Sequence, residues 1–433
     1  MGTFKFPLSM LLLFLLLNIF LCSAEVLYLP VTKDASTMQY ITEVSQRTPL
    51  IPIKLLVHLG GRSLWVDCNN STSYKSSTYK PAVCNSTQCS ISRSHGCGDC
   101  KFRPQLQPGC NNNTCYIWGE NPLINTYIDH AEVAEDVLII GSTPGVRVNW
   151  PRFIFTCLID PSMVRLLADG VTGAAGFGHE SLISIPNQLA LDPRFTRKFG
   201  MCLSSSTSSR GVIFIGSGPY YAYNPKKIDI SKDLVYTKLI TNKRAFLLSD
   251  EYYFQISSIR IAGQDVPLNK TLLSINNKQN GIGGTKISTA IPFTILHSTF
   301  YDAVRTAFIK ALPKNVTLVE PPPMSQFRTC FSSENIKSTN VGPDVPAIDI
   351  VLYKTSAFWR IYGTNSMVQV SKEVMCLAFV GQDQTWGSSI VIGGHQLEEN
   401  LLVFDLPGKK IGFSSSLKLQ QTSCSKYDDT IMD

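Results

Sequence analysis

Charged residues are scarce in this sequence: Asp, Glu, Lys and Arg make up 16 % of its 433 residues, whereas hydrophobic residues make up 44 %. This composition excludes a disordered, coiled-coil or collagen-like chain and provides apolar material for a sizeable core. The formal net charge of +7 is too small for this length to indicate a nucleic-acid-binding protein. Beyond the first 24 residues, no apolar run is long enough to span a bilayer, so we expect no membrane association. The length predicts two large lobes.

Motifs for metal binding and for several kinds of catalysis are also missing. The six histidines form no His-Glu-X-X-His pattern, and no Gly-X-Ser-X-Gly motif is present. The segment Gly281–Gly284 lacks the residue order of a phosphate-binding loop. Cys97 and Cys100 have the spacing of a zinc or redox pair, but no second pair matches them and the neighbouring cysteines favour structural disulfides. We therefore predict no metal site and no cofactor.

The N-terminus has the features of a secretory signal. Lys5 precedes an apolar run from Met10 to Cys22, and Cys22-Ser23-Ala24 offers small residues before a cleavage site. We predict a signal peptide over residues 1–24 and a secreted protein. Cleavage leaves twelve of the 13 cysteines, an even number that predicts six disulfides in an oxidising compartment. They are Cys68, Cys84, Cys89, Cys97, Cys100, Cys110, Cys115, Cys157, Cys202, Cys330, Cys376 and Cys424.

Glycosylation sequons agree with secretion, because each occupied sequon requires an exposed loop. The sequons at Asn69 and Asn70 overlap, so we expect at most one glycan there, at Asn70. The other predicted sites are Asn85, Asn112, Asn269 and Asn315.

Short strands separated by Gly, Pro, Asn and Ser dominate the pattern and predict an all-β architecture. The expected strands are 54–59, 64–66, 137–140, 153–157, 212–215, 252–261, 348–352, 389–392 and 401–405. Helical periodicity is limited to 162–168, 184–191 and 298–311. The polar run Ser204–Ser209 lies near the middle of the mature chain, so we predict an N-terminal lobe over 25–208 and a C-terminal lobe over 209–433.

The two halves contain related short sequence segments. In the first, Leu64-Trp65-Val66 leads into Asp67-Cys68-Asn69, and the glycine-rich segment 170–178 follows much later. In the second, Gly283-Gly284-Thr285-Lys286-Ile287 leads into Ser288-Thr289-Ala290, and Ile390–Gly394 follows. Each half thus has a strand that delivers a small polar turn and a later apolar strand that could cross behind it.

These phrases closely resemble plant pepsin-type aspartic proteases, and above all their catalytically silent branch. That branch contains the extracellular dermal glycoprotein, xyloglucan-specific endoglucanase inhibitor proteins, seed basic globulins and cereal xylanase inhibitors. The matching phrases include 64–68, 76–79, 108–115, 171–189, 211–220, 283–288 and 389–414. The resemblance covers the whole mature chain. It implies a bilobal, all-β, pepsin-like fold with a few short helices.

The resemblance also directs attention to the catalytic loops. Aspartic proteolysis needs two carboxylates that share one proton, each normally within Asp-Thr/Ser-Gly. The first loop is interpreted as Asp67-Cys68-Asn69, in which the acid is a relic, and the second as Ser288-Thr289-Ala290, in which serine replaces the acid. A serine hydroxyl cannot hold the shared proton, so we predict no proteolytic activity. A residual or altered hydrolase is the alternative.

In the family, bridges at matching positions join Cys202 to Cys424 and Cys330 to Cys376, whereas the other eight cysteines allow 105 pairings. Family members that inhibit xyloglucanases use basic residues on two C-lobe loops, and the positions interpreted as matching are Leu318 and Lys410, next to Lys409. The resemblance thus implies an apoplastic inhibitor of microbial glycoside hydrolases of the family 12 or family 11 type. The alternative is a storage, ligand-binding or peptide-binding globulin without inhibitory activity.

Overall fold

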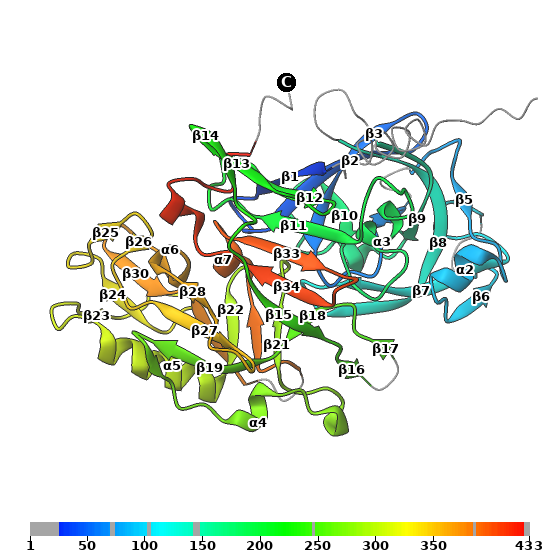
Figure 1. The fold of residues 1–433 in the computed structure, drawn as a ribbon. Helices are drawn as coiled ribbons and strands as arrows, with labels where there is room; N and C mark the ends of the chain where they lie inside the picture. The colour runs from blue at the N-terminus through cyan, green and yellow to red at the C-terminus, as the bar shows by residue number, and fades with distance from the viewer. Residues whose placement is uncertain are drawn as a thin grey trace, which may run out of the picture.

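The computed structural model describes residues 26–69, 74–101, 105–141, 148–244, 247–383 and 387–427 (Figure 1). The expected signal peptide and the sequon at Asn70 lie outside these residues. Within them, no helix has both the length and the apolar character that crossing a membrane would require.

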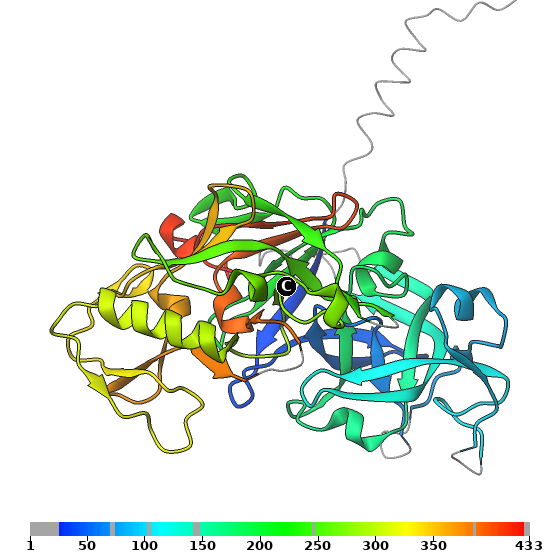
Figure 2. The ribbon, with the colours of Figure 1, turned by 90° about the horizontal axis from the view of Figure 1, so that it is seen from below.

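A central antiparallel sheet contains strands from both halves of the chain (Figures 1 and 2). Its order is β1 (Leu27–Lys33), β12 (Gly211–Ile215), β11 (Lys198–Cys202), β33 (Leu401–Asp405), β34 (Lys410–Phe413) and β15 (Val235–Ile240). The contact between the halves runs through β11 and β33, where Phe199 and Phe404 stack with ring centroids 4.5 Å apart. The segment 203–210, which holds the predicted lobe boundary, connects β11 to β12.

Each half repeats the same four-strand arrangement. In the first half, β10 (Val171–Gly176) lies parallel to β3 (Ile51–His58) and antiparallel to β4 (Trp65–Asp67), which lies parallel to β9 (Val148–Leu158). In the second half, β32 (Ile390–Ile392) lies parallel to β21 (Thr285–Ile287) and antiparallel to β22 (Thr294–His297), which lies parallel to β31 (Phe379–Gln382). Strand β3 therefore corresponds to β21, and β4 corresponds to β22.

The remaining elements complete the two halves. The N-terminal half adds β2 (Tyr40–Gln46), β5 (Lys80–Pro81), α2 (Thr87–Ile91), β6 (Gly96–Gly98), β7 (Thr114–Asn121), β8 (Thr126–Ile140), η1 (Pro161–Val164) and α3 (Ile185–Leu189). The second half adds β13 (Tyr221–Asn224), β14 (Lys226–Asp229), β16 (Lys243–Arg244), β17 (Leu247–Leu248), β18 (Tyr252–Phe254), β19 (Ile256–Ile261), β20 (Gln264–Asp265), α4 (Lys270–Leu273), η2 (Asn277–Gln279) and α5 (Ser298–Ala311). It continues with β23 (Leu318–Val319), β24 (Cys330–Ser332), β25 (Ser338–Thr339), β26 (Gly342–Pro343), β27 (Ile348–Leu352), β28 (Phe358–Ile361), α6 (Gly363–Ser366), β29 (Met367–Gln369), β30 (Val374–Leu377), α7 (Gly394–Leu397) and η3 (Leu417–Gln420).

The predicted all-β fold with few short helices is confirmed, and helix 298–311 is found as α5. This helix buries Phe300, Val304 and Phe308 at helical spacing against the core. The helix expected at 162–168 is wrong, because only a 3-10 turn forms at 161–164 and Leu166 adopts φ +62°. The single strand expected at 252–261 is two strands: β18 pairs with β21, whereas β19 pairs with β27 in another sheet.

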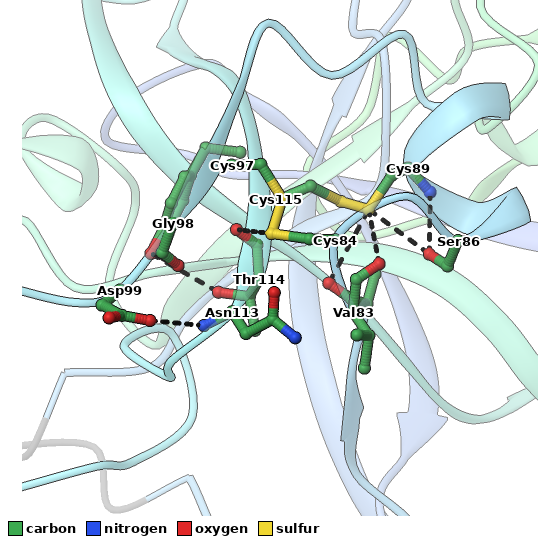
Figure 3. Close-up of a disulfide and its surroundings, with 12 residues drawn as sticks. Val83, Cys84, Ser86, Cys89, Cys97, Gly98, Asp99, Asn113, Thr114 and Cys115 are labelled. Carbon is green, nitrogen blue, oxygen red and sulfur yellow. Dashed lines mark hydrogen bonds between the residues drawn. A yellow bond between two sulfur atoms is a disulfide. The ribbon is translucent and has the colours of Figure 1, made fainter.

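Six disulfides pair all twelve cysteines of the described chain. They are Cys68–Cys157, Cys84–Cys97, Cys89–Cys115, Cys100–Cys110, Cys202–Cys424 and Cys330–Cys376. Three of them lie within the turn-rich segment 84–115, in which β6 pairs with β7, and Figure 3 shows two of these bridges with the contacts around them. Cys202–Cys424 joins the central sheet to the C-terminal segment.

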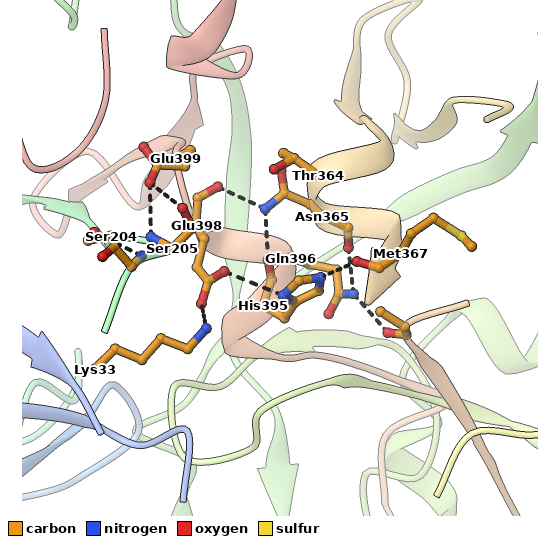
Figure 4. Close-up of polar contacts among 12 residues, drawn as sticks. Lys33, Ser204, Ser205, Thr364, Asn365, Met367, His395, Gln396, Glu398 and Glu399 are labelled. Atoms are coloured by element: carbon orange, nitrogen blue, oxygen red, sulfur yellow. Dashed lines mark hydrogen bonds and ion pairs between the residues drawn. The ribbon is translucent and has the colours of Figure 1, made fainter. Parts of the chain in front are cut away.

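A buried ion pair also connects the halves (Figure 4). Lys33 at the end of β1 lies with its Nζ 2.6 Å from Oε1 of Glu398, which follows α7, and both side chains are almost fully buried. The hydroxyl of Tyr40 donates to the same carboxylate oxygen at 2.7 Å. The imidazole of His395 lies 3.4 Å from the other carboxylate oxygen, so Glu398 is surrounded by polar partners from both halves.

Candidate functional site

The loops that follow the equivalent strands β3 and β21 meet at the junction of the halves. Thr289 Oγ1 donates to the carbonyl oxygen of Val57 at 2.6 Å and accepts from the backbone N–H of Leu59 at 3.1 Å. These bonds hold the loop 288–290 directly against the loop 57–60. The reciprocal bond cannot form, because Leu59 occupies the position equivalent to Thr289 and has no hydroxyl group.

A cavity of about 1000 Å³ opens over this junction. Ser288 lines it from the second half and His58 from the first, together with Glu120, Glu251, Lys286 and Tyr127. His58 directly precedes Leu59 as Ser288 precedes Thr289, so these two side chains occupy equivalent positions at the two strand ends. The paired loops therefore present an imidazole and a hydroxyl.

The structure corrects the interpretation of Asp67 as the partner of Ser288. Asp67 ends β4, one strand later than the loop that contacts Thr289, and is not among the residues that line the cavity. Its carboxylate accepts from the N–H of Asn69 at 2.9 Å, next to the Cys68–Cys157 disulfide. Burial raises the pKa of Asp67, against the lowering effects of this hydrogen bond and of Arg47. The equivalent residue in the second half is His297, at the end of β22.

His58 was not predicted from the sequence, because the first catalytic position was assigned to the carboxylate next to Leu64-Trp65-Val66. A signal was present: His58 is followed by Leu59-Gly60-Gly61, and a glycine-containing turn suits a close approach of two loops. At Gly61 an added Cβ would lie 2.8 Å from the Cα of Gly176, so a side chain would clash there.

His58 and Glu120 lie in contact inside the cavity. His58 Nε2 lies 3.2 Å from Glu120 Oε1, and 6 % of the His58 side chain is exposed. Burial lowers the pKa of His58 to about 4, an effect that Glu251 opposes and Lys286 reinforces. Burial and the nearby carboxylates of Glu251 and Asp250 raise the pKa of Glu120 to about 8. Burial thus favours the neutral form of both side chains.

Ser288 has no base directed at it among the contacts of the described residues. Its N–H donates to the carbonyl oxygen of Ile392 at 2.9 Å, and its hydroxyl oxygen accepts from the N–H of Ala290 at 3.2 Å. His58 Nδ1 is buried and has no hydrogen-bond partner, so it makes no hydrogen bond with the Ser288 hydroxyl. These contacts fix the loop conformation and give no sign of an activated nucleophile.

The residues predicted to contact a glycosidase lie in different sheets. Leu318 is in β23, at the outer end of the second half, and is 46 % exposed. Lys409 and Lys410 belong to the β33–β34 hairpin of the central sheet (Figure 1). Lys409 is exposed, whereas Lys410 lies 3.8 Å from Asp405 Oδ2. The structure does not bring Leu318 and this hairpin together.

The predicted glycosylation sites that can be located all lie on the surface. Asn85, Asn112, Asn269 and Asn315 are exposed. Asn269 also caps α4, because its side-chain oxygen accepts from the N–H of Thr271 at 3.0 Å. Among the residues with a described position, no group of three or more His, Cys, Asp or Glu side chains could hold a metal ion.

Two β-rich halves with one repeated arrangement, a shared sheet and paired loops over a junction cavity define a pepsin-like protein. The family profile described as xylanase inhibitor N-terminal matches residues 40–217, and the one described as xylanase inhibitor C-terminal matches residues 251–415. The chain belongs to this family of plant pepsin-like proteins, whose members are generally non-catalytic.

Relatives cover nearly the whole chain. The probable aspartic proteinase GIP2 of Nicotiana benthamiana is 46 % identical over 416 residues, which are 93 % of this chain and 92 % of that protein. Gamma conglutin 1 of Prunus dulcis is 39 % identical over 407 residues, 93 % of this chain and 89 % of that protein. The crystal structure of edgp matches with a TM-score of 0.87 and 47 % identity over 93 % of this chain and 98 % of that one. Conglutin gamma from lupine seeds matches with a TM-score of 0.80 and 34 % identity over 94 % and 99 %.

Proposed function

We propose that this protein is a secreted, proteolytically silent pepsin homologue that binds and blocks a microbial cell-wall-degrading glycoside hydrolase. The observation that carries the first part is the pair of residues at the loop junction. Aspartic proteolysis needs two carboxylates that share a proton, and His58 and Ser288 stand where the two strand ends meet. Neither side chain is a carboxylate, so the shared proton has no site.

The inhibitory part rests on the family and on an exposed cation in a turn of the central sheet. Glycosidases carry two carboxylates in an open cleft, so a cation on a rigid projection suits them. The turn 406–409 is rigid, because the N–H of Gly408 donates to Asp405 Oδ1 at 2.8 Å and that of Lys409 donates to the carbonyl oxygen of Leu406 at 3.2 Å. Lys409 is exposed on this turn, and we propose it as the contact residue. Leu318, at a separate place, is the competing contact.

Inhibition constants against a panel of family 12 and family 11 glycosidases test the proposal. We expect Lys409→Glu to weaken inhibition by about tenfold or more, because it places a carboxylate against carboxylates. Lys354→Glu is the matched control, since Lys354 is also an exposed turn lysine with positive φ. Loss of inhibition in Leu318→Glu but not in Lys409→Glu would move the contact to β23. If micromolar wild-type protein inhibits no enzyme of the panel, the inhibitor proposal fails.

The junction cavity favours one alternative, a ligand-binding globulin. Its volume of about 1000 Å³ and its mixed lining of Glu251, Lys286, Tyr127 and Ile291 suit a polar ligand with an apolar part. Binding of peptides that Lys286→Ala abolishes, in a protein that inhibits no glycosidase, would favour this alternative.

A further inference from the structure

Four charged residues form a straight row across the central sheet. In the strand register, Lys198 of β11 lies opposite Asp405 of β33, Asp405 lies opposite Lys410 of β34, and Lys410 lies opposite Lys238 of β15. Directly opposed residues of antiparallel strands project from the same face, and neighbouring strands are about 4.8 Å apart. The row therefore extends over about 14 Å on one face of the sheet. Phe199, Phe404 and Ile411, one position along, project into the core from the other face.

Two of the three lysines of this row, Lys198 and Lys410, share one carboxylate. Asp405 is 8 % exposed at its side chain, and its Oδ2 lies 3.0 Å from Lys198 Nζ and 3.8 Å from Lys410 Nζ. The Lys198 and Lys410 side chains remain 35 % and 44 % exposed. Lys238 is exposed, and no carboxylate of the described residues lies within 4 Å of its ammonium group. Asp405 thus fixes Lys198 and Lys410 without neutralising the row, which keeps a net charge of two positive units.

An exposed aromatic ring lies beside the row on the same face. Tyr236 precedes Lys238 by two residues, faces Gly412 in the register and is 41 % exposed. The ring lies close over Gly412, where an added Cβ would come within 2.6 Å of the tyrosine Cε1. The Nζ of Lys410 lies 4.7 Å from the ring centroid. The glycine therefore lets the ring rest on the sheet, next to the cations, as a flat surface with a polar edge.

We propose that this surface, Lys198, Lys410, Lys238 and Tyr236, binds a linear anionic polysaccharide with repeating carboxylate groups, such as a polyuronate. The cations lie in line, with Lys410 one strand from Lys238 and two strands from Lys198, so they can meet charges that recur along an extended chain. Flexible lysine ammonium groups act as point charges that do not require the forked geometry of one fixed carboxylate. The tyrosine ring beside the row offers an apolar contact for a sugar ring. An acidic protein surface is the other polyanion that the row could meet, and the experiment separates the two.

Binding of the full mature protein to polygalacturonate, followed by calorimetry at low salt, tests this inference. The matched ligand is fully methyl-esterified polygalacturonate, which has the same backbone without charges. We expect binding to the first polymer only, with an affinity that falls steeply as salt is raised. Lys198→Gln/Lys238→Gln should lower the affinity about tenfold or more, whereas Lys337→Gln/Lys354→Gln, at exposed lysines elsewhere, should leave it unchanged.

Lys238→Gln alone is the variant that avoids the Asp405 network, and it should weaken binding without changing the thermal midpoint. This substitution also leaves the Lys409 turn intact, so glycosidase inhibition and polysaccharide binding can fail separately. Equal losses in the row and control variants, or binding of the esterified polymer with equal affinity, would overturn the inference. Absence of polygalacturonate binding would also overturn the inference, even if an acidic protein binds at the row.

Discussion

Replacement of Glu398 by glutamine tests the buried link between the two halves. Glutamine keeps the shape of the side chain and removes its charge. Lys33 then retains a buried ammonium group whose nearest anionic oxygen, at 2.6 Å, has become a neutral amide. Lys33 is 7 % exposed, so water cannot replace the lost partner without a local rearrangement.

The expected cost follows from this burial. Breaking a buried ion pair by removing one partner costs about 3–5 kcal/mol, because an uncompensated charge stays inside the protein. The entropy of unfolding is about 2.1 cal/mol/K per residue, which amounts to about 0.9 kcal/mol/K for a mature chain of this size. A loss of about 4 kcal/mol therefore lowers the unfolding temperature by about 4 °C.

Thermal unfolding followed by circular dichroism, at a fixed scan rate and with disulfides intact, measures this shift. Glu373→Gln, at an exposed glutamate, is the control and should change the midpoint by less than about 1 °C. Lys33→Met combined with Glu398→Gln should recover much of the loss, because no buried charge remains unpaired. A shift below about 1 °C for Glu398→Gln, or strictly additive losses in the double variant, would refute the reasoning.

The pH dependence gives a second readout of the same link. Burial alone would raise the pKa of Glu398, but hydrogen bonding and charge from His395 and Lys33 lower it below its ordinary value. A carboxyl group with a lowered folded pKa contributes stability above its unfolded pKa and loses it as the pH falls through the folded pKa. The difference between the wild type and Glu398→Gln should therefore be constant above about pH 5 and shrink in acid.

Three further outcomes are expected. Ser288→Asp alone should show no protein cleavage at acidic pH, because His58 still supplies no second carboxyl group; pepstatin-sensitive cleavage by this variant would contradict the assignment of the loops. Glu120→Gln should raise the unfolding temperature at pH 8 by an amount that corresponds to roughly 1–3 kcal/mol, and this gain should vanish near pH 4. With a folded pKa of about 8, the wild type loses stability as the pH rises through the range where only the unfolded glutamate ionises. A pH-independent effect of the substitution would argue against this pKa. Thiol titration of the mature protein in denaturant without reductant should find no free thiol, and two or more per molecule would contradict the six pairings.

The sequence was informative where one element's own pattern determines its structure. Helix α5 could be predicted because its apolar residues recur at helical spacing after a Ser/Thr start. The segment 162–168 does not form the predicted helix. Asp160 caps only a short 3-10 turn, and the side chain of Met163 is buried in the core. Strand 252–261 divides because its two ends pair with different partners, β21 and β27, and no local pattern specifies a distant partner.

Of the two residues at the loop junction, one was predicted from the sequence and the other was not. Ser288 could be located because a distinctive phrase surrounds it, and the structure places it in the cavity. For His58 the sequence offers only the glycine turn that follows it, because the contact that identifies it as the counterpart joins Thr289 to Val57 and Leu59, more than 200 positions away. The row of three lysines and Asp405 could not be predicted from the sequence. Its four residues come from four strands, and only the folded sheet defines their register.

The shared central sheet has a consequence for the order in which the protein can fold during synthesis. Strand β1 emerges first but its neighbour β12 follows about 180 residues later, and β11 must wait for β33 near residue 401. Contacts of such large sequence separation form slowly. The bridges Cys84–Cys97, Cys100–Cys110 and Cys89–Cys115 span at most 26 positions and can close while the chain is still being made. Cys202–Cys424 spans 222 positions and can close only after translation is nearly finished. Secretory chaperones should therefore meet a long-lived intermediate with a braced N-terminal half and an open central edge.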